Sequence, residues 1–170
     1  MKPYIKKYSV VVRNFTFGVE DSLVSTVGLL AGIAIAHVDS KTIVLTGVVL
    51  IFVEAFSMGV GSLLSEQSVE EYESQKEVAL SKPILAAVVM FVSYVVAGLI
   101  PLAPYVIDAG TGSVIWSVGL TLAALATLGA FNAHIFRVRV WKDALITLLM
   151  GGLAIGVGVV VGQIVGVIAK

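Results

Sequence analysis

Five apolar segments, each long enough to cross a lipid bilayer, follow one another along the chain. A membrane span needs about 20 mainly apolar residues to cross about 30 Å of hydrocarbon. The segments that qualify cover residues 15–36, 42–64, 83–107, 113–136 and 144–169, and a charged stretch, residues 65–82, separates the second from the third. Each span is predicted to be an α-helix, because an open strand or loop would leave its backbone unpaired in lipid. The sequence therefore predicts one all-α, five-span transmembrane domain over residues 1–170.

The composition agrees with a membrane location. Hydrophobic residues make up 58% of the 170 residues and charged residues 13%, and the mean hydropathy is +1.04. A soluble domain of this size cannot bury so much apolar side chain, so most of the surface is expected to face lipid. The net charge of zero gives no sign of nucleic-acid binding, and the absence of cysteine excludes disulfides, zinc–thiolate sites and thiol catalysis.

The basic residues predict the orientation. The N-terminus resembles the basic start of a signal peptide, but no small-residue cleavage site follows and the apolar run is too long, so a retained span is expected. With the N-terminus in the cytoplasm, only Lys41 and Lys170 lie outside. The basic residues on the cytoplasmic side are then Lys2, Lys6, Lys7, Arg13, Lys76, Lys82, Arg137, Arg139 and Lys142. This asymmetry predicts an N-in, C-out topology.

The first span carries a seam of small and polar residues. At about 100° per residue, a sector about 80° wide contains Asn14, Gly18, Asp21, Ser25, Gly28 and Gly32. A helix that faces lipid on all sides has no use for such a seam, whereas a helix that lines a path through protein does.

Asp21 is the first candidate for chemistry within this seam. A carboxylate deep in a span is unfavourable by about 2.5 kcal/mol or more, and it can be neutralised either by a proton or by a cation. Such a group can exchange a proton for a metal ion; alternatively, a protonated Asp21 forms a hydrogen bond to another helix. Glu20 points about 100° away from Asp21 and is either a second proton site or a contact to an outer helix.

The second span adds Glu54 and Met58, which lie four residues apart and therefore on one helical face. Ser57 and Ser62 lie beside this face. A carboxylate suits divalent ions, and a thioether favours softer transition metals such as Fe2+ over Mg2+ or Ca2+. The alternative for Met58 is ordinary packing.

An acidic run follows the second span directly. If the helix continues into the cytoplasm, four carboxylates spaced by 4, 3 and 4 residues share one face, namely Glu66, Glu70, Glu73 and Glu77. Like charges at this spacing repel one another, and a bound divalent cation would offset the repulsion. The alternative is a solvated helical face. On a straight helix this face is rotated by roughly 110° from that of Glu54 and Met58.

Other polar and small residues suggest structural roles. His37 and His134 lie at span ends without a ligand-spaced partner, and no Gly-x-Ser-x-Gly, Walker or His-Glu-x-x-His signature is present, so an enzyme is not expected. Glycines spaced by four in the fifth span predict close packing against another helix of the same chain. These are Gly152 and Gly156, then Gly158, Gly162 and Gly166.

Three segments resemble the vacuolar iron transporter family of plants and yeast. FGVEDSLVSTVGLLAG is similar to the family's first-helix motif, F-G-x-x-D-G-L-V-S-T. AFSMGVGSLLSEQSVEEYE is similar to the second-helix motif, G-A-x-S-M-G-x-G-x-Y-L-S, with the start of its acidic extension. KPILAAVVMFVSYVVAGLIPLAPYVI is similar to the third span with its L-P-L-x-P-Y end.

The resemblance implies a five-helix homodimer with an ion path between the two subunits. Family members move Fe2+, and often Mn2+, out of the cytosol in exchange for protons. Asp21 matches the family's first-helix aspartate and Met58 its second-helix methionine, so the resemblance implies that both line the path.

The chain departs from the family pattern in three places. Ser22 stands where the family has glycine, and Glu20 adds an acid beside Asp21. Leu50 stands where the family has a glutamate, two turns before Met58, and Glu54 lies one turn closer on a similar face. Residues 65–82 are far too few for the glutamate-rich cytoplasmic domain of larger members, as in the shorter nodulin-like branch.

We therefore expect a homodimeric transporter that exports Fe2+ or Mn2+ as its substrate, with no permanently bound cofactor and with the lipid bilayer as its surroundings. The expected metal ligands are Asp21, Glu54, Met58, Glu66, Glu70, Glu73 and Glu77. The expected path or proton residues are Glu20, Asn14, Ser25, Ser57 and Ser62. A prokaryotic cell membrane is the expected location, or a vacuolar membrane in a eukaryote. The rival hypotheses are a non-transporting membrane scaffold and a transporter of organic cations.

Overall fold

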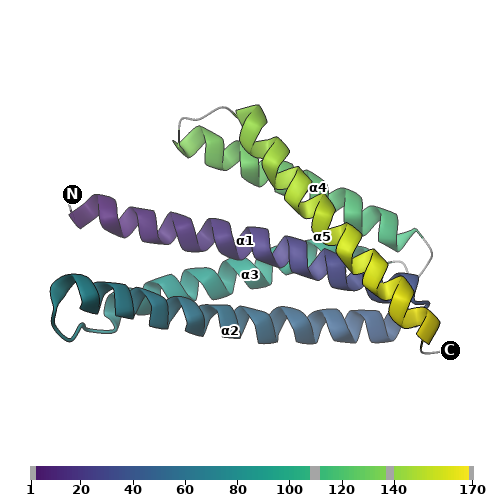
Figure 1. Ribbon diagram of the computed structural model, residues 1–170, viewed down its shortest axis with the longest axis horizontal. Coiled ribbons are helices and arrows are strands. Elements are labelled where there is room, and N and C mark those ends of the chain that lie inside the picture. The colour runs from purple at the N-terminus through teal and green to yellow at the C-terminus, as the bar shows by residue number, and fades with distance from the viewer. Residues whose placement is uncertain (1–2, 108–111, 137–139, 169–170) are drawn as a thin grey trace.

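The computed structural model describes residues 3–107, 112–136 and 140–168, which form a bundle of long helices (Figure 1). The helices are α1 (Pro3–Ile35), α2 (Ser40–Ser74), α3 (Ser81–Ile107), α4 (Ser113–Phe136) and α5 (Val140–Ile168). All five contain a segment long and apolar enough to cross a membrane. The chain is therefore a multi-pass membrane protein, and the predicted all-α fold with five spans is confirmed. Among the residues named in the sequence predictions, Lys2, Arg137, Arg139, Ala169 and Lys170 lie outside the described residues.

α1 lies at the centre of the bundle. It contacts each of the other four helices and runs between the α2–α3 pair and the α4–α5 pair (Figure 1). α2 contacts α1 and α3, and α5 contacts α1 and α4, whereas no contact joins the described parts of α2 and α5. Because α1 has protein neighbours on several sides, it carries more small and polar residues than a lipid-facing helix tolerates.

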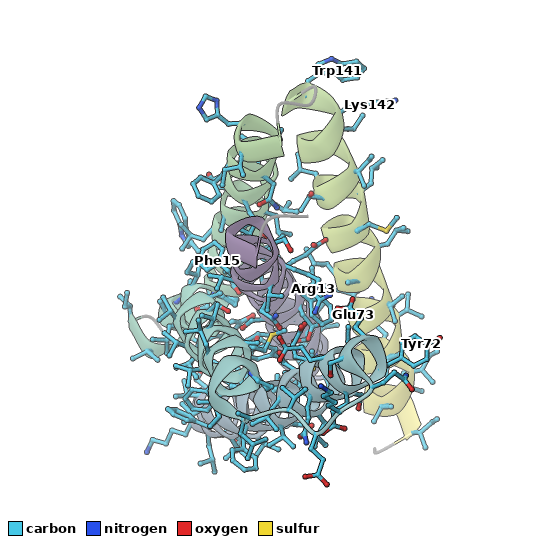
Figure 2. All side chains as sticks on the ribbon, turned by 90° about the vertical axis from the view of Figure 1, so that its left-hand side faces the viewer. Arg13, Phe15, Tyr72, Glu73, Trp141 and Lys142 are labelled. Atoms are coloured by element: carbon cyan, nitrogen blue, oxygen red, sulfur yellow. The ribbon has the colours of Figure 1, made fainter. Side chains whose placement is uncertain are left out.

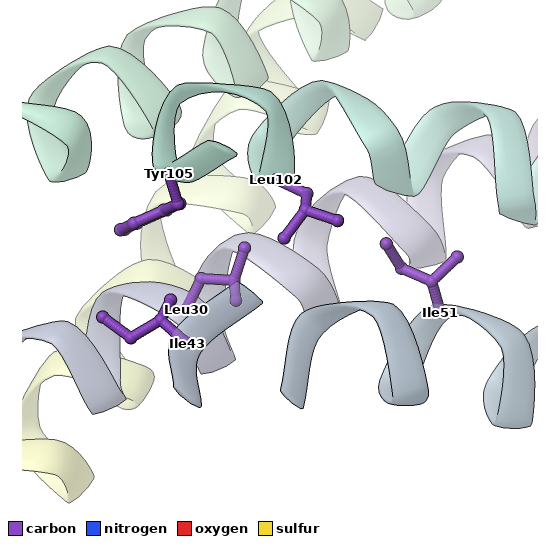
Figure 3. Close-up of a cluster of buried hydrophobic side chains, with 5 residues drawn as sticks. All are labelled: Leu30, Ile43, Ile51, Leu102 and Tyr105. Carbon is purple, nitrogen blue, oxygen red and sulfur yellow. The ribbon is translucent and has the colours of Figure 1, made fainter. Parts of the chain in front are cut away.

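An apolar cluster fixes one end of the three-helix unit formed by α1, α2 and α3. Its buried members, drawn in Figure 3, come from all three helices and are Leu30, Ile43, Ile51, Leu102 and Tyr105. A second cluster joins α1 to α3 and α4 through Leu23, Ala97 and Leu125. Because lipid is as apolar as these side chains, close packing rather than exclusion from water holds the clusters together.

Glycines hold α1 against α5. A Cβ atom added to Gly158 or Gly162 would overlap the backbone carbonyl of Gly28 or Gly32, and one added to Gly166 would lie 3.2 Å from Cα of Ala36. The predicted packing of these three α5 glycines against another helix of the same chain is therefore confirmed. The prediction is wrong for Gly152 and Gly156, because a Cβ atom at either position would have no neighbour within 4 Å.

α2 is one continuous helix that starts after the residues between the first and second spans and extends into the acidic segment. It begins after Asp39, whose carboxylate accepts hydrogen bonds from the backbone N–H (3.0 Å) and the hydroxyl (2.8 Å) of Thr42. It ends at Ser74, where Gln75 takes a left-handed conformation (φ 52°) and its backbone N–H donates to the carbonyl of Glu71. The predicted continuation of the second helix therefore holds as far as Glu73, whereas Glu77 lies beyond the helix and not on its acidic face.

Candidate functional site

Polar side chains from α1 and α2 meet along the contact between the two helices. The helices run antiparallel, so rising numbers on α1 face falling numbers on α2. Three pairs join them: Arg13 with Glu66, Asn14 with Ser62, and Ser25 with Glu54. We call these six residues, together with Asp21 and Met58, the α1–α2 polar stripe. Met58 belongs to it because it lies four residues from both Glu54 and Ser62.

Glu54 is the innermost acid of the stripe, and two hydroxyl groups converge on one of its oxygen atoms. The hydroxyl of Tyr94, from α3, donates a hydrogen bond to Oε2 of Glu54. The hydroxyl of Ser25 donates to the same oxygen at 3.2 Å and lies 2.7 Å from the Tyr94 hydroxyl. Glu54 is thus oriented by both neighbouring helices.

Asp21 faces the same region from α1. Its side chain is partly buried, follows Glu20 directly, and lies one turn before Ser25, whose hydroxyl donates to Glu54, so the carboxylates of Asp21 and Glu54 meet at the same contact. The next residue of α1, Ser22, donates a hydrogen bond of 2.6 Å to the backbone carbonyl of Tyr94. This bond fixes α1 against α3 next to the acids, so Ser22, which departs from the family's glycine, has a packing role.

Nearer the N-terminal end of the bundle, Asn14 connects the stripe to the rest of α1. Its side-chain oxygen accepts a hydrogen bond from Ser62, and its amide group donates to the carbonyl of Val10 at 2.9 Å. On another side of α1, Thr16 donates to the side-chain oxygen of Asn132 on α4 at 3.0 Å. These bonds satisfy polar side chains within an apolar bundle.

An ion pair between Arg13 and Glu66 ends the stripe. Glu66 is 7% exposed, whereas the side chain of Arg13 is 63% exposed. Figure 2, which looks onto this end of the bundle, shows Arg13 between α1 and the last turns of α2, where Tyr72 and Glu73 lie. The carboxylate of Glu66 is thus buried beneath the exposed side chain of Arg13.

The seam predicted on α1 does not face a single surface. Asn14 and Ser25 face α2, whereas a Cβ atom at Gly18 would lie 3.0 Å from the carbonyl of Met90 on α3. Gly28 and Gly32 receive the glycines of α5. The seam therefore serves several helix contacts, and its members Ser25, Gly28 and Gly32 also line one groove together with Glu54. That the seam lines an ion path stays a prediction.

The remaining predicted site residues are spread around the stripe. Ser57 and Glu73 are exposed, Glu70 is partly buried, and Glu77 is exposed beyond α2. His37 and His134 are both exposed. Within the described ranges, no three His, Cys, Asp or Glu side chains gather into a group that could hold a metal ion.

A groove opens between α1, α2 and α5 beside the stripe. It has a volume of about 630 Å³, and its lining is apolar apart from Ser25 and Glu54. Leu50, which stands where the resemblance places a glutamate, lines the same groove as Glu54. The carboxylate is therefore shifted by one turn but opens onto the same groove.

The sequence analysis predicted neither a role for Tyr94 nor the pairing of Arg13 with Glu66. Tyr94 is fully buried in the middle of α3, and a buried hydroxyl in a membrane span needs a hydrogen-bond partner. That need was the available signal for Tyr94. The pairing of Arg13 with Glu66 depends on the register between two helices and has no local sequence signal.

Comparison with known proteins identifies the family. The sequence profile of the VIT family matches residues 12–81 and 70–163. This chain belongs to the VIT family.

Two relatives are similar to this chain over most of its length. Vacuolar iron transporter homolog 1 of Arabidopsis thaliana is 27% identical over 169 residues, which is 91% of this chain and 83% of that protein. Vacuolar iron transporter homolog 5 of Oryza sativa subsp. japonica is 25% identical over 159 residues, or 86% of this chain and 76% of that protein.

A third relative matches more closely over a shorter stretch. Vacuolar iron transporter 1 of Oryza sativa subsp. japonica is 36% identical over 84 residues, which covers 46% of this chain and 33% of that protein. The predicted resemblance to the vacuolar iron transporters is thus confirmed.

Proposed function

We propose that this VIT-family chain transports a divalent transition metal ion, Fe2+ or Mn2+, out of the cytoplasm in exchange for protons. One observation carries the proposal: inside the membrane-spanning bundle Glu54 of α2 accepts a hydrogen bond from Ser25 of α1, one turn from Asp21, so carboxylates from two helices meet at one contact. Two negative charges there are unfavourable unless protons or a cation neutralise them. A divalent ion matches their combined charge.

The ligand chemistry favours a transition metal. Met58 lies one turn from Glu54 on the stripe, so a thioether is available beside the carboxylates. Sulfur binds Fe2+ better than Mg2+ or Ca2+, and carboxylate oxygen binds all of them. The names of the relatives, which are vacuolar iron transporters and homologs, point to the same cargo.

Proton exchange follows from the chemistry of the two acids. Carboxylates that lie close together in a membrane span are neutralised either by protons or by a cation. A metal ion that binds Asp21 and Glu54 takes the place of protons, which then move in the opposite direction. The hydroxyls of Ser25 and Tyr94 orient Oε2 of Glu54 for this exchange.

A second copy of the chain completes the proposed path. The groove that exposes Glu54 is open between α2 and α5, and in a bilayer that opening would place a carboxylate against hydrocarbon. A second copy related by two-fold symmetry covers the groove, and each copy then contributes one Asp21 and one Met58 to the path. In the predicted N-in orientation, Glu66, Glu70 and Glu73 lie at the cytoplasmic entrance, and Glu77 lies near them in the following loop. The membrane is that of a prokaryotic cell, or of a vacuole in a eukaryote.

Flux into proteoliposomes tests this proposal. Fe2+, Mn2+ and Mg2+ are supplied separately, with a metal indicator and a pH indicator inside the vesicles. We expect saturable Fe2+ or Mn2+ flux with opposite proton movement, no Mg2+ flux, and loss of transport in Asp21→Asn. Asp39→Asn is the matched control, because it makes the same chemical change outside the spans. If the reconstituted wild type carries no divalent ion, the proposal is overturned in favour of a membrane scaffold.

A further inference from the structure

The two partners of the Arg13–Glu66 ion pair have very different surroundings. Glu66 is 7% exposed, so its charge is poorly solvated without a partner. The side chain of Arg13 is 63% exposed and precedes the span predicted at residues 15–36, and a long basic side chain near a span end extends to the membrane–water interface. Separating the pair therefore leaves Arg13 well solvated, whereas Glu66 requires a replacement cation.

The pair also lies at one end of the α1–α2 polar stripe. One turn further into the bundle, Ser62 bonds to Asn14, the residue that follows Arg13. Asp21 and Glu54 lie deeper along the same contact between α1 and α2. An ion that reaches the inner acids along the polar stripe from this end passes Glu66, where it meets Arg13.

We propose that Arg13 is a tethered competitor that occupies Glu66 until a divalent metal ion displaces it, and that it thereby sets the metal affinity at the entrance. The inference rests on the proposed function in taking Glu66 as an entrance ligand. Arg13 is a specificity-determining residue in this scheme, because it selects for ions that attract Glu66 more strongly than a guanidinium group does.

The charges explain the selectivity. A monovalent ion brings the same single charge as Arg13 but cannot match the paired N–H donors of a guanidinium group. A divalent ion brings twice the charge, so its attraction to a carboxylate at equal distance is doubled. Divalent ions therefore displace Arg13, and Na+ or K+ ions do not.

Binding of Mn2+ to the purified protein in detergent tests the inference without any need for transport. Mn2+ is chosen because it does not oxidise in air as Fe2+ does. Equilibrium dialysis is performed on wild type, Arg13→Gln, Glu66→Gln and the double variant. Because the competitor is gone, Arg13→Gln is expected to bind Mn2+ roughly three- to tenfold more tightly than wild type. Glu66→Gln is expected to bind more weakly, and the double variant is expected to match Glu66→Gln.

Two controls separate this effect from general charge and folding effects. Lys142 on α5 is exposed at the same end of the bundle (Figure 2). Lys142→Gln removes its positive charge and is expected to leave the Mn2+ affinity unchanged. The chain has no cysteine, so Arg13→Cys offers a unique thiol. Attaching an aminoethyl group to Cys at this position restores a positive charge and is expected to weaken Mn2+ binding again, whereas a methyl group is not.

The inference would be overturned if Arg13→Gln bound Mn2+ no more tightly than wild type. It would also be overturned if methylated Arg13→Cys bound Mn2+ no more tightly than aminoethylated Arg13→Cys. Failure of the proposed function is a different result, namely a wild type that does not transport metal. The binding comparison keeps its meaning in that case.

Discussion

The hydroxyl of Tyr94 on α3 donates a hydrogen bond to Oε2 of Glu54 on α2, so a helix that carries no acid of its own orients the innermost acid of the stripe. Tyr94 is itself fixed, because it is fully buried and its backbone carbonyl accepts a hydrogen bond from Ser22 on α1. Three helices therefore determine where one carboxylate points.

Replacing Tyr94 by Phe should lower metal flux. The change removes one hydrogen bond to a carboxyl group, and such bonds contribute about 1.5–3 kcal/mol when the group is charged, so flux is expected to fall roughly tenfold or more. Proteoliposome flux measures the effect. Tyr72→Phe is the control, since Tyr72 is exposed at the end of α2. Unchanged flux in Tyr94→Phe would contradict the role given to Tyr94.

Replacing Met58 by Leu should change which metal the protein prefers. The two side chains have similar volumes, so the expected loss of stability is below about 1.5 kcal/mol. Loss of the thioether is expected to reduce Fe2+ flux more than Mn2+ flux, because Fe2+ has the greater affinity for sulfur. The measurement is the ratio of the two fluxes in the same vesicle preparation. An equal reduction for both ions would assign Met58 to packing alone.

Substitution of Gly162 by Ala should separate α5 from α1. A Cβ atom there would overlap the carbonyl of Gly32, and such overpacking costs about 1–3 kcal/mol. The expected result is a lower unfolding temperature in detergent. Gly156→Ala is the matched control, because a Cβ atom at Gly156 meets nothing within 4 Å. Equal unfolding temperatures for the two variants would show that the α1–α5 contact does not require glycine.

Asp39 should make the start of α2 sensitive to acid. Hydrogen bonds from the backbone N–H and then the hydroxyl of Thr42 hold the pKa of Asp39 below its ordinary value. The stabilisation from its charge is fully present above the unfolded-state pKa of about 3.9 and is lost as the pH falls through the lower folded-state pKa. The unfolding temperature of wild type should therefore fall further than that of Asp39→Asn between roughly pH 5 and pH 2. Parallel curves for the two proteins would contradict this prediction.

The sequence was sufficient to predict what depends on a single helix. The five spans follow from runs of apolar residues, and the continuation of α2 as far as Glu73 follows from the absence of a break signal. Position within one helix also placed Glu54 and Met58 on a shared face. These features need no knowledge of neighbouring helices.

Features that depend on two helices were predicted less well. The seam on α1 joins polar residues that meet α2 and glycines that meet α5, and the angular sector alone does not distinguish these neighbours. The pairs between Tyr94 and Glu54 and between Arg13 and Glu66 depend on helix register and tilt. Ser57 is exposed on α2, so its predicted place on the path remains a prediction that requires the second copy.

The central position of α1 restricts how this protein can change during evolution. A substitution on a buried face of α1 affects packing against one or more of four neighbouring helices. Asp21 lies on this same helix, so a substitution that changes the surroundings of its carboxylate is also expected to disturb the packing of the bundle. New metal preferences are therefore expected to arise more readily through α2 and α3, which contact fewer helices, than through α1.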